Sequence, residues 1–193
     1  MSPDSMTGDR TKTHPTRQEP GLTYALRRLH EDETALAAHL ATMGEQHRSE
    51  HEIHHVTRDL LAWSHDNLAQ VANTAAKHHT HLNAQPGEAT GKLPDPALVA
   101  ADGHPAGLRL LEDLRNTYLL ASATSLSWEL LAQYAQARCE SDILELAGRC
   151  HPRTLRQMRW ANTMLKTQSP QILTSFVETG PSGIECVVRA DRS

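Results

Sequence analysis

The sequence predicts an all-α protein: an antiparallel bundle of four long helices, with a long crossover that joins the second helix to the third. In four separate segments of the 193-residue chain, apolar residues recur at alternating spacings of three and four, which is typical of amphipathic helices. Two of the three connections between these segments are short. The middle one has about 25 residues and is rich in Gly, Pro, Asp and Ala.

The first helix is predicted over residues 21–46 and the second over residues 49–81. The apolar stripe of the first is formed by Leu22, Leu26, Leu29, Leu36, Leu40 and Met43. Ser49 followed three residues later by Glu52 forms a capping box, which predicts where the second helix begins. Its buried line is formed by Ile53, Val56, Leu60, Trp63 and Val71.

The connection over residues 82–107 is predicted to run the length of the bundle. A helix of about 30 residues is about 45 Å long, and about 25 extended residues reach further than that. A crossover of this kind makes the second and third helices parallel, while the short connections make the other pairs antiparallel.

The third helix is predicted over residues 108–138 and the fourth over residues 141–168. Ser141 or Asp142 is expected to cap the fourth helix, and Pro170 is expected to stop it. Pro152 removes one backbone donor inside this pattern, so a kink is expected near Cys150 and His151.

One bundle domain is therefore predicted over residues 20–172. The polar residues 1–19 are expected to be a disordered lead, since they contain almost nothing to bury. Residues 173–193 form a tail with a short apolar patch at residues 184–188, for which an edge element, a docking segment and disorder remain alternatives.

Composition excludes several classes of protein. No apolar run reaches the length of a membrane span, and the first twenty residues lack the hydrophobic centre of a signal peptide, so a cytoplasmic protein without membrane contact is expected. The formal net charge is −4 and the basic residues are scattered, which argues against a nucleic-acid surface. The three cysteines match no metal-binding spacing and are expected to be reduced thiols.

The order of helices and connections resembles the ferritin-like superfamily. The RQMRW segment at residues 156–160, followed by Thr163, Lys166 and the Pro170–Gln171 pair, is similar to uncharacterised ferritin-like proteins of actinobacteria. The resemblance covers roughly residues 21–172 and implies a fold more than an activity.

Several polar residues fall on the predicted buried lines when each helix is projected at about 100° per residue. They are Glu33 on the first helix, Asn67 with Ser64 on the second, Glu129 on the third, and Thr154 and Cys150 with His151 at the flank on the fourth. In the one-crossover topology Glu33, Asn67, Glu129 and His151 have similar heights, about 14 to 20 Å from one end. The sequence therefore predicts a polar layer in the core.

Ferritin-like di-iron proteins place one Glu on each of two helices and a Glu-x-x-His motif on each of the other two. Glu33 and Glu129 match the single-Glu positions, but neither remaining helix carries the motif near this depth, so the di-iron motif is degenerate. Two interpretations stay open: a single iron or other divalent ion held by Glu33, Glu129 and His151, with Asn67, Ser64 and Thr154 as neighbours, or a polar layer that bonds internally and fixes the helix register.

Thirteen histidines are the unusual feature of the composition. His47, His51, His54 and His55 are predicted to share one outward face at the second helix, opposite Ile53. Histidines four residues apart can chelate Zn, Ni or Cu. The alternatives are a solvated or protomer-contact face, and a metal-binding or pH-sensing face.

The function most consistent with these observations is a non-catalytic structural or protein-interaction module, expected to self-associate or bind a protein partner. Trp160 lies off the buried line of its helix and is a candidate interface residue. The alternative is a non-haem iron or other metal-binding protein, oxidative or storage, that uses the reduced ligand set in the core. No nucleophile–base pattern or phosphate loop is found, so no catalytic residue is predicted.

Overall fold

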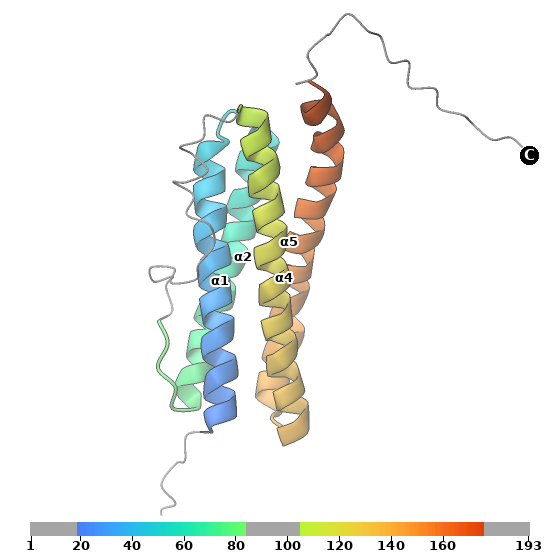
Figure 1. Ribbon diagram of the computed structural model, residues 1–193. Coiled ribbons are helices and arrows are strands. Elements are labelled where there is room, and N and C mark those ends of the chain that lie inside the picture. The colour runs from blue at the N-terminus through green and yellow to red at the C-terminus, as the bar shows by residue number, and fades with distance from the viewer. Residues whose placement is uncertain (1–18, 84–104, 176–193) are drawn as a thin grey trace, which may run out of the picture.

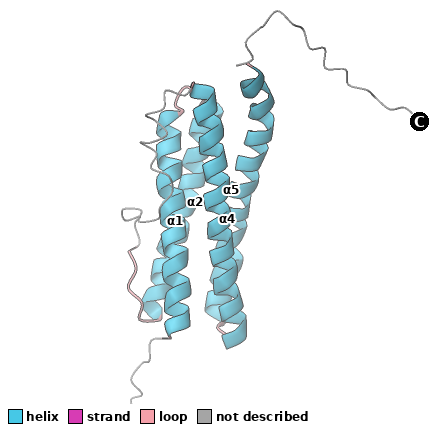
Figure 2. Ribbon diagram, in the orientation of Figure 1, coloured by secondary structure: helices cyan, strands magenta, loops and turns pink. Residues whose placement is uncertain are grey.

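The computed structural model describes residues 19–83 and 105–175, and this part of the chain is all-helical. The four helices are α1 (Pro20–Gln46), α2 (His51–Lys77), α4 (Ala106–Arg138) and α5 (Ser141–Thr174), and no strand occurs among the described residues (Figures 1 and 2). The all-α prediction is confirmed. None of the described helices is both long and apolar enough to cross a membrane.

The helices pack as a ring in which α1 contacts α2 and α4, and α5 contacts α4 closely but α2 only sparsely. Contacts at the helix ends show how α1 lies against its neighbours. At its start, Glu19 Oε1 accepts a hydrogen bond from Arg138 Nη2 at the end of α4, at 2.9 Å. At its other end, His47 Nε2 lies 2.7 Å from Asp113 Oδ2 near the start of α4. The first half of α1 also lies beside the residues that follow α2, where Thr23 Oγ1 is 3.3 Å from Thr80 Oγ1 and His30 Nε2 is 2.6 Å from the carbonyl oxygen of Asn83.

The buried side chains of every helix recur at alternating intervals of three and four, which is a repeat of 3.5 residues. Among the buried residues, those that form this seam in α1 are Leu22, Leu26, Leu29, Glu33, Leu36, Leu40 and Met43, and those in α4 are Leu114, Thr117, Ala121, Thr124, Trp128, Leu131 and Ala135. A sustained 3.5-residue repeat is typical of helices that coil around one another with a left-handed twist.

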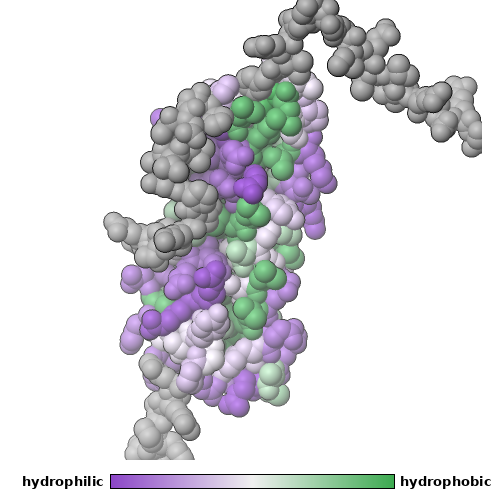
Figure 3. Space-filling view, in the orientation of Figure 1, coloured by the Kyte–Doolittle hydropathy of each residue, from purple (hydrophilic) through white to green (hydrophobic). Residues whose placement is uncertain are grey.

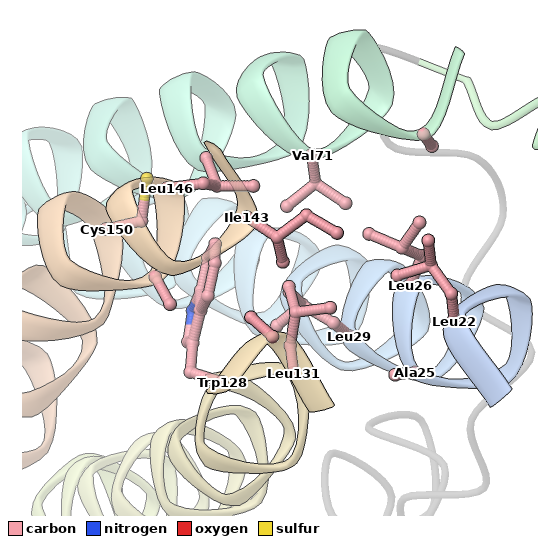
Figure 4. Packing of buried hydrophobic residues seen from close by; sticks show 13 residues of the cluster. Leu22, Ala25, Leu26, Leu29, Val71, Trp128, Leu131, Ile143, Leu146 and Cys150 are labelled. Carbon is pink, nitrogen blue, oxygen red and sulfur yellow. The ribbon is translucent and has the colours of Figure 1, made fainter. Parts of the chain in front are cut away.

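Apolar clusters occupy both ends of the bundle. One contains Leu26, Val71, Leu131 and Ile143, with Trp128 at its edge (Figure 4). In this view the indole nitrogen of Trp128 is on the side of the ring turned away from the cluster's leucines. The opposite end is closed by a cluster of Met43, Ile53, Leu110, Leu114 and Met164. A third cluster, of Leu36, Leu40, Leu60, Leu120 and Ala121, lies between these two ends, and so does the buried carboxylate of Glu33.

The structure corrects both predicted ends of the second helix. α2 begins at His51, after Glu50, and no side chain caps it, because Ser49 belongs to a turn closed by the Glu50 N–H on the His47 carbonyl at 3.0 Å. It ends at Lys77 instead of residue 81. His79 adopts a left-handed conformation, with φ 57°, and the Thr80 N–H bonds the Ala75 carbonyl at 2.8 Å, which is the Schellman closure of a helix.

The third and fourth helices also differ from their predicted bounds. α4 begins at Ala106, and the break that follows it is made by Cys139 in a left-handed conformation, φ 59°. α5 begins after Glu140 without a side-chain cap, so neither Ser141 nor Asp142 has the predicted capping role.

α5 also continues through Pro152 and Pro170 to Thr174 instead of ending at residue 168. Packing accounts for the extension, because Ile172 is in van der Waals contact with the first turn of α4 near Gly107 and joins the cluster at that end. The kink expected near His151 stays a prediction. The predicted lead to residue 18, residues 84–104 of the crossover and the tail patch at 184–188 lie outside the described residues.

Candidate functional site

Glu33 lies at the centre of the polar layer and is completely buried. Its Oε1 accepts hydrogen bonds from one side chain on each of the other three helices. Asn67 Nδ2 of α2 donates at 2.8 Å, Trp128 Nε1 of α4 at 3.1 Å, and Thr154 Oγ1 of α5 at 3.4 Å. One carboxylate oxygen therefore ties all four helices together at a single level of the bundle.

Burial raises the pKa of Glu33 from 4.5 to about 7, because an ionised carboxylate loses its hydration in the core. The hydrogen bonds from Asn67 and Trp128, together with smaller contributions from Ser64 and Thr154, favour the ionised form and limit the shift. Near neutral pH, Glu33 is therefore poised between its protonated and ionised forms.

Gln157 of α5 forms a second row of the polar layer. Its Nε2 donates to the carbonyl oxygen of Leu60 and to Ser64 Oγ, both at 2.9 Å, and the side chain has no exposed surface. Glu33 Oε2 and Gln157 Oε1 are buried acceptors without a hydrogen-bond partner among the described residues. Gln157 was not predicted as a core residue, although it continues the seam of Cys150, Thr154 and Ala161 at intervals of three and four.

Arg153 connects this layer to the surface between α2 and α5. Its Nη1 donates to Asn67 Oδ1 at 3.3 Å and also pairs with Asp66. The Arg153 hydrogen bond lowers the pKa of Asp66. Because Asn67 accepts from Arg153 and donates to Glu33, its amide is oriented by both neighbours.

The three residues predicted to hold an ion are not brought together. Glu33 is in the core, but Glu129 is exposed, and half-buried His151 places Nε2 2.7 Å from Ser125 Oγ. Burial lowers the pKa of His151, while nearby Glu129 acts in the opposite direction. No group of three or more His, Cys, Asp or Glu side chains in the described ranges is arranged to hold a metal ion.

The position of Glu129 was wrong for a geometric reason. Projection at 3.6 residues per turn places residue 129 over Leu111, because the 18 residues between them complete five turns. The buried seam of α4 repeats every 3.5 residues instead, and the two lines diverge by about 20° per heptad. Over this separation the difference is about 50°. Trp128 consequently takes the inward position and Glu129 turns outward.

These positions also decide whether a di-iron site fits. Such a site needs carboxylates and imidazoles that project inward from all four helices. At this level Glu33 is matched by the amide of Asn67, the indole of Trp128 and the hydroxyl of Thr154. Three of these four groups are neutral donors to the carboxylate, so the residues present do not fit a di-iron centre.

The predicted histidine face is divided by the structure. His47 follows α1, is 7% exposed and pairs with Asp113, so it belongs to the α1–α4 contact. His54 is partly buried, with Nδ1 2.8 Å from the Gly44 carbonyl oxygen. His51 and His55 are exposed, and their ring centroids lie 4.2 Å apart. Only this pair keeps the outward position expected for all four.

A recess of about 610 Å³ lies at the end of the bundle where α1, α4 and α5 meet. Its lining includes Gln46, His47, Arg109, Gln168 and Ile172. His47 is the one predicted site residue among them, and it is already held by Asp113. The recess is therefore separate from the polar layer at Glu33.

Exposed apolar side chains gather on α4 instead of at Trp160. Trp160 is partly buried and packs against two of the core clusters, so its prediction as a surface contact is corrected. The outward face of α4 carries Leu119, Leu126 and Leu130, which are 47%, 62% and 53% exposed. The sequence signal that could have shown this face is the absence of any charged residue from position 116 to 128.

Comparison of the chain with protein-family models, with curated proteins and with solved structures gives no match.

Proposed function

We propose that this chain is a ferritin-like bundle that acts as a non-catalytic structural or protein-interaction module and self-associates. The cytoplasmic location and the absence of nucleic-acid and membrane contacts, expected from the sequence, are part of the proposal.

The antiparallel topology with a crossover is supported by the helix ends. Asn83 lies beside the first half of α1, whereas Ala106 and His47 line the same recess at its other end. The 27 residues of α1 span about 40 Å. The two described positions that flank this connection, Asn83 and Ala106, thus lie toward opposite ends of α1, which supports the proposed ferritin-like crossover.

The observation that carries the proposed function is the direction of the hydrogen bonds in the polar layer. The donors of Asn67, Trp128 and Thr154 all end on Glu33 Oε1, and the donors of Gln157 end on Leu60 and Ser64. A layer of this kind fixes the register of four helices, because each displacement leaves a buried polar group unpaired. It is a structural use of polar residues.

A second candidate, a metal-binding protein with a reduced ligand set, is favoured by one observation. Glu33 Oε2 and Gln157 Oε1 are buried oxygen acceptors without a partner among the described residues. Oxygen ligands suit Mg²⁺, Mn²⁺ or Fe²⁺ better than softer ions. Such an ion would be held by Glu33 and Gln157 in the core, without Glu129 or His151.

Elemental analysis distinguishes the two candidates. The full chain is purified without a histidine tag, and wild type is compared with Glu33→Gln and with the matched control Glu129→Gln. The structural function predicts no stoichiometric metal in any sample and no thermal shift on anaerobic addition of Fe(II) or Mn(II). About one equivalent of metal, lost in Glu33→Gln and kept in Glu129→Gln, would replace the structural proposal by the metal-binding one.

A further inference from the structure

α4 carries apolar side chains on two opposite faces. Its inward seam contains Leu114, Ala121, Trp128 and Leu131, all buried. Its outward face carries Leu119, Ala123, Leu126 and Leu130, which follow one another at intervals of four, three and four. Of the seven large hydrophobic residues exposed in the described ranges, four lie on α4 and none on α2. A helix that is apolar on two sides is normally covered on two sides.

The middle of the outward face is also uncharged. No charged residue occurs between Arg115 and Glu129, a distance of almost four helical turns. Figure 3 shows apolar side chains in a broken column along α4. On α5, exposed Leu144 lies one heptad before His151, which contacts α4, and so extends the apolar surface on that side.

We propose that a second copy of this chain docks on the outward face of α4, with the two α4 helices antiparallel about a two-fold axis between Ser122 and Ala123. This inference rests on the self-association in the proposed function and names its surface. Leu119 and Leu126 are equally far from this axis along the helix. Leu119 of one copy therefore lies opposite Leu126 of the other, and this contact occurs twice. Ser122 and Ala123, both small and partly buried, lie at the axis, where the two helices approach most closely.

Charge complementarity favours this arrangement and a second copy as the occupant. In the antiparallel register, Arg115 lies beside Glu129 of the second copy, and Glu129 lies beside Arg115 of the second copy. Arg115 is exposed, with only a 3.9 Å i,i+3 contact to Glu112, and Glu129 is exposed. A parallel pairing in register would place Arg115 against Arg115 and Glu129 against Glu129, which is unfavourable. The uncharged leucine face thus has Arg115 at one end and Glu129 at the other, and the two-fold axis places each beside the opposite charge of the second copy.

Sedimentation velocity of the full 193-residue chain over a wide concentration range tests the surface. Wild type is expected to form a dimer. Leu126→Glu should weaken dimerisation at least about 100-fold, because the contact is lost twice per dimer and two charges would be buried. The matched control Leu173→Glu, at an exposed leucine on α5, should leave the dimer unchanged. Far-UV circular dichroism checks that both variants keep their helical content.

A charge-reversal cycle tests the register. Arg115→Glu should weaken the dimer roughly three- to tenfold by placing like charges together, and adding Glu129→Arg should restore it. The antiparallel register would be overturned if Leu126→Glu is monomeric but the addition of Glu129→Arg does not restore the dimer weakened by Arg115→Glu. A dimer that survives Leu126→Glu would overturn this surface and leave self-association standing. A wild-type monomer at every concentration would overturn both, while elemental analysis still decides separately whether the core is structural.

Discussion

The two faces of α4 each depart from the pattern usually expected of a helix in a bundle, which buries apolar side chains and exposes polar ones. The inward face buries Thr117, Thr124 and Ser127, whereas the outward face exposes Leu119 and Leu126. Position on α4 therefore contributes to burial alongside hydrophobicity, since hydroxyl side chains are buried while leucines are exposed. The outward leucines keep about half of their surface exposed in a single chain, and this apolar surface is available for an external contact.

The inward polar residues of α4 are tolerated because they are small and their hydroxyl groups are hydrogen-bonded. Thr117 Oγ1 donates to the Asp113 carbonyl at 2.8 Å, and Thr124 Oγ1 donates to the Leu120 carbonyl at 2.9 Å, each one turn back along the same helix. Neither threonine hydroxyl is left unpaired, so its desolvation cost is offset locally, whereas Ser127 Oγ donates to Asp32 Oδ2 of α1 at 2.6 Å. The longer polar side chains, Glu33 and Gln157, must instead find partners on other helices.

Removing the largest inward side chain should have the largest effect on stability. Trp128→Ala deletes a fully buried indole and the hydrogen bond to Glu33, and is expected to cost about 3–5 kcal/mol of unfolding free energy. Urea unfolding followed by circular dichroism measures the loss. Trp128→Phe, which keeps most of the volume but not the donor, should cost only about 1–3 kcal/mol. Equal losses in the two variants would contradict the role given to the indole nitrogen.

Titration of Glu33 should make the inward face sensitive to pH. Its pKa in the folded state is about 7, above the ordinary value of 4.5, so the folded chain binds the proton more tightly than the unfolded chain. This contribution to stability is complete below about pH 4.5 and is lost as the pH rises through about 7, on the order of 3 kcal/mol in total.

The difference between wild type and Glu33→Gln isolates the contribution of this carboxyl from that of every other titrating group. Unfolding free energies measured between pH 4.5 and 8 should fall more steeply for wild type than for Glu33→Gln. The exposed Glu129→Gln should retain the wild-type slope. Parallel curves for wild type and Glu33→Gln would show that the core carboxyl does not change its protonation on folding.

Gln157 should matter less than Trp128 but more than any outward residue. Gln157→Leu keeps a similar volume but leaves the Leu60 carbonyl and the Ser64 hydroxyl without the amide donor, at an expected cost of about 1–3 kcal/mol. Thermal and urea unfolding measure the difference. Gln171→Leu, at an exposed position of α5, is the matched control and should stay within about 0.5 kcal/mol of wild type.

The smallest effect is expected on the outward face. Leu126→Ala, studied at a concentration where the chain is monomeric, should change the unfolding free energy by less than about 0.5 kcal/mol, because the side chain is 62% exposed. Leu131→Ala, at a fully buried position five residues away, should cost about 2–5 kcal/mol. Similar losses for the two leucines would mean that the outward face is already covered within one chain.

Much of the polar layer could be predicted from the sequence. Glu33, Asn67, Ser64 and Thr154 interrupt apolar stripes, and all four are completely buried in the layer. Glu129 and Gln157 could not be placed correctly from the sequence. An error of one residue in the phase of a helix, which is its rotation about its own axis, turns an inward side chain outward and its neighbour inward. The phase is set by supercoiling against the other helices, which a straight projection of one helix omits.

The sequence by itself determined that the described chain is helical and where its four helices lie, because local periodicity and the breaks between segments are properties of neighbouring residues. Only the tertiary structure decided which polar groups meet. His47 became part of the α1–α4 contact through Asp113, and Trp128 replaced Glu129 beside Glu33. Tertiary packing also left the outward leucines of α4 uncovered. Each of these outcomes depends on residues far apart in the chain, whose relative positions are fixed only when the helices pack.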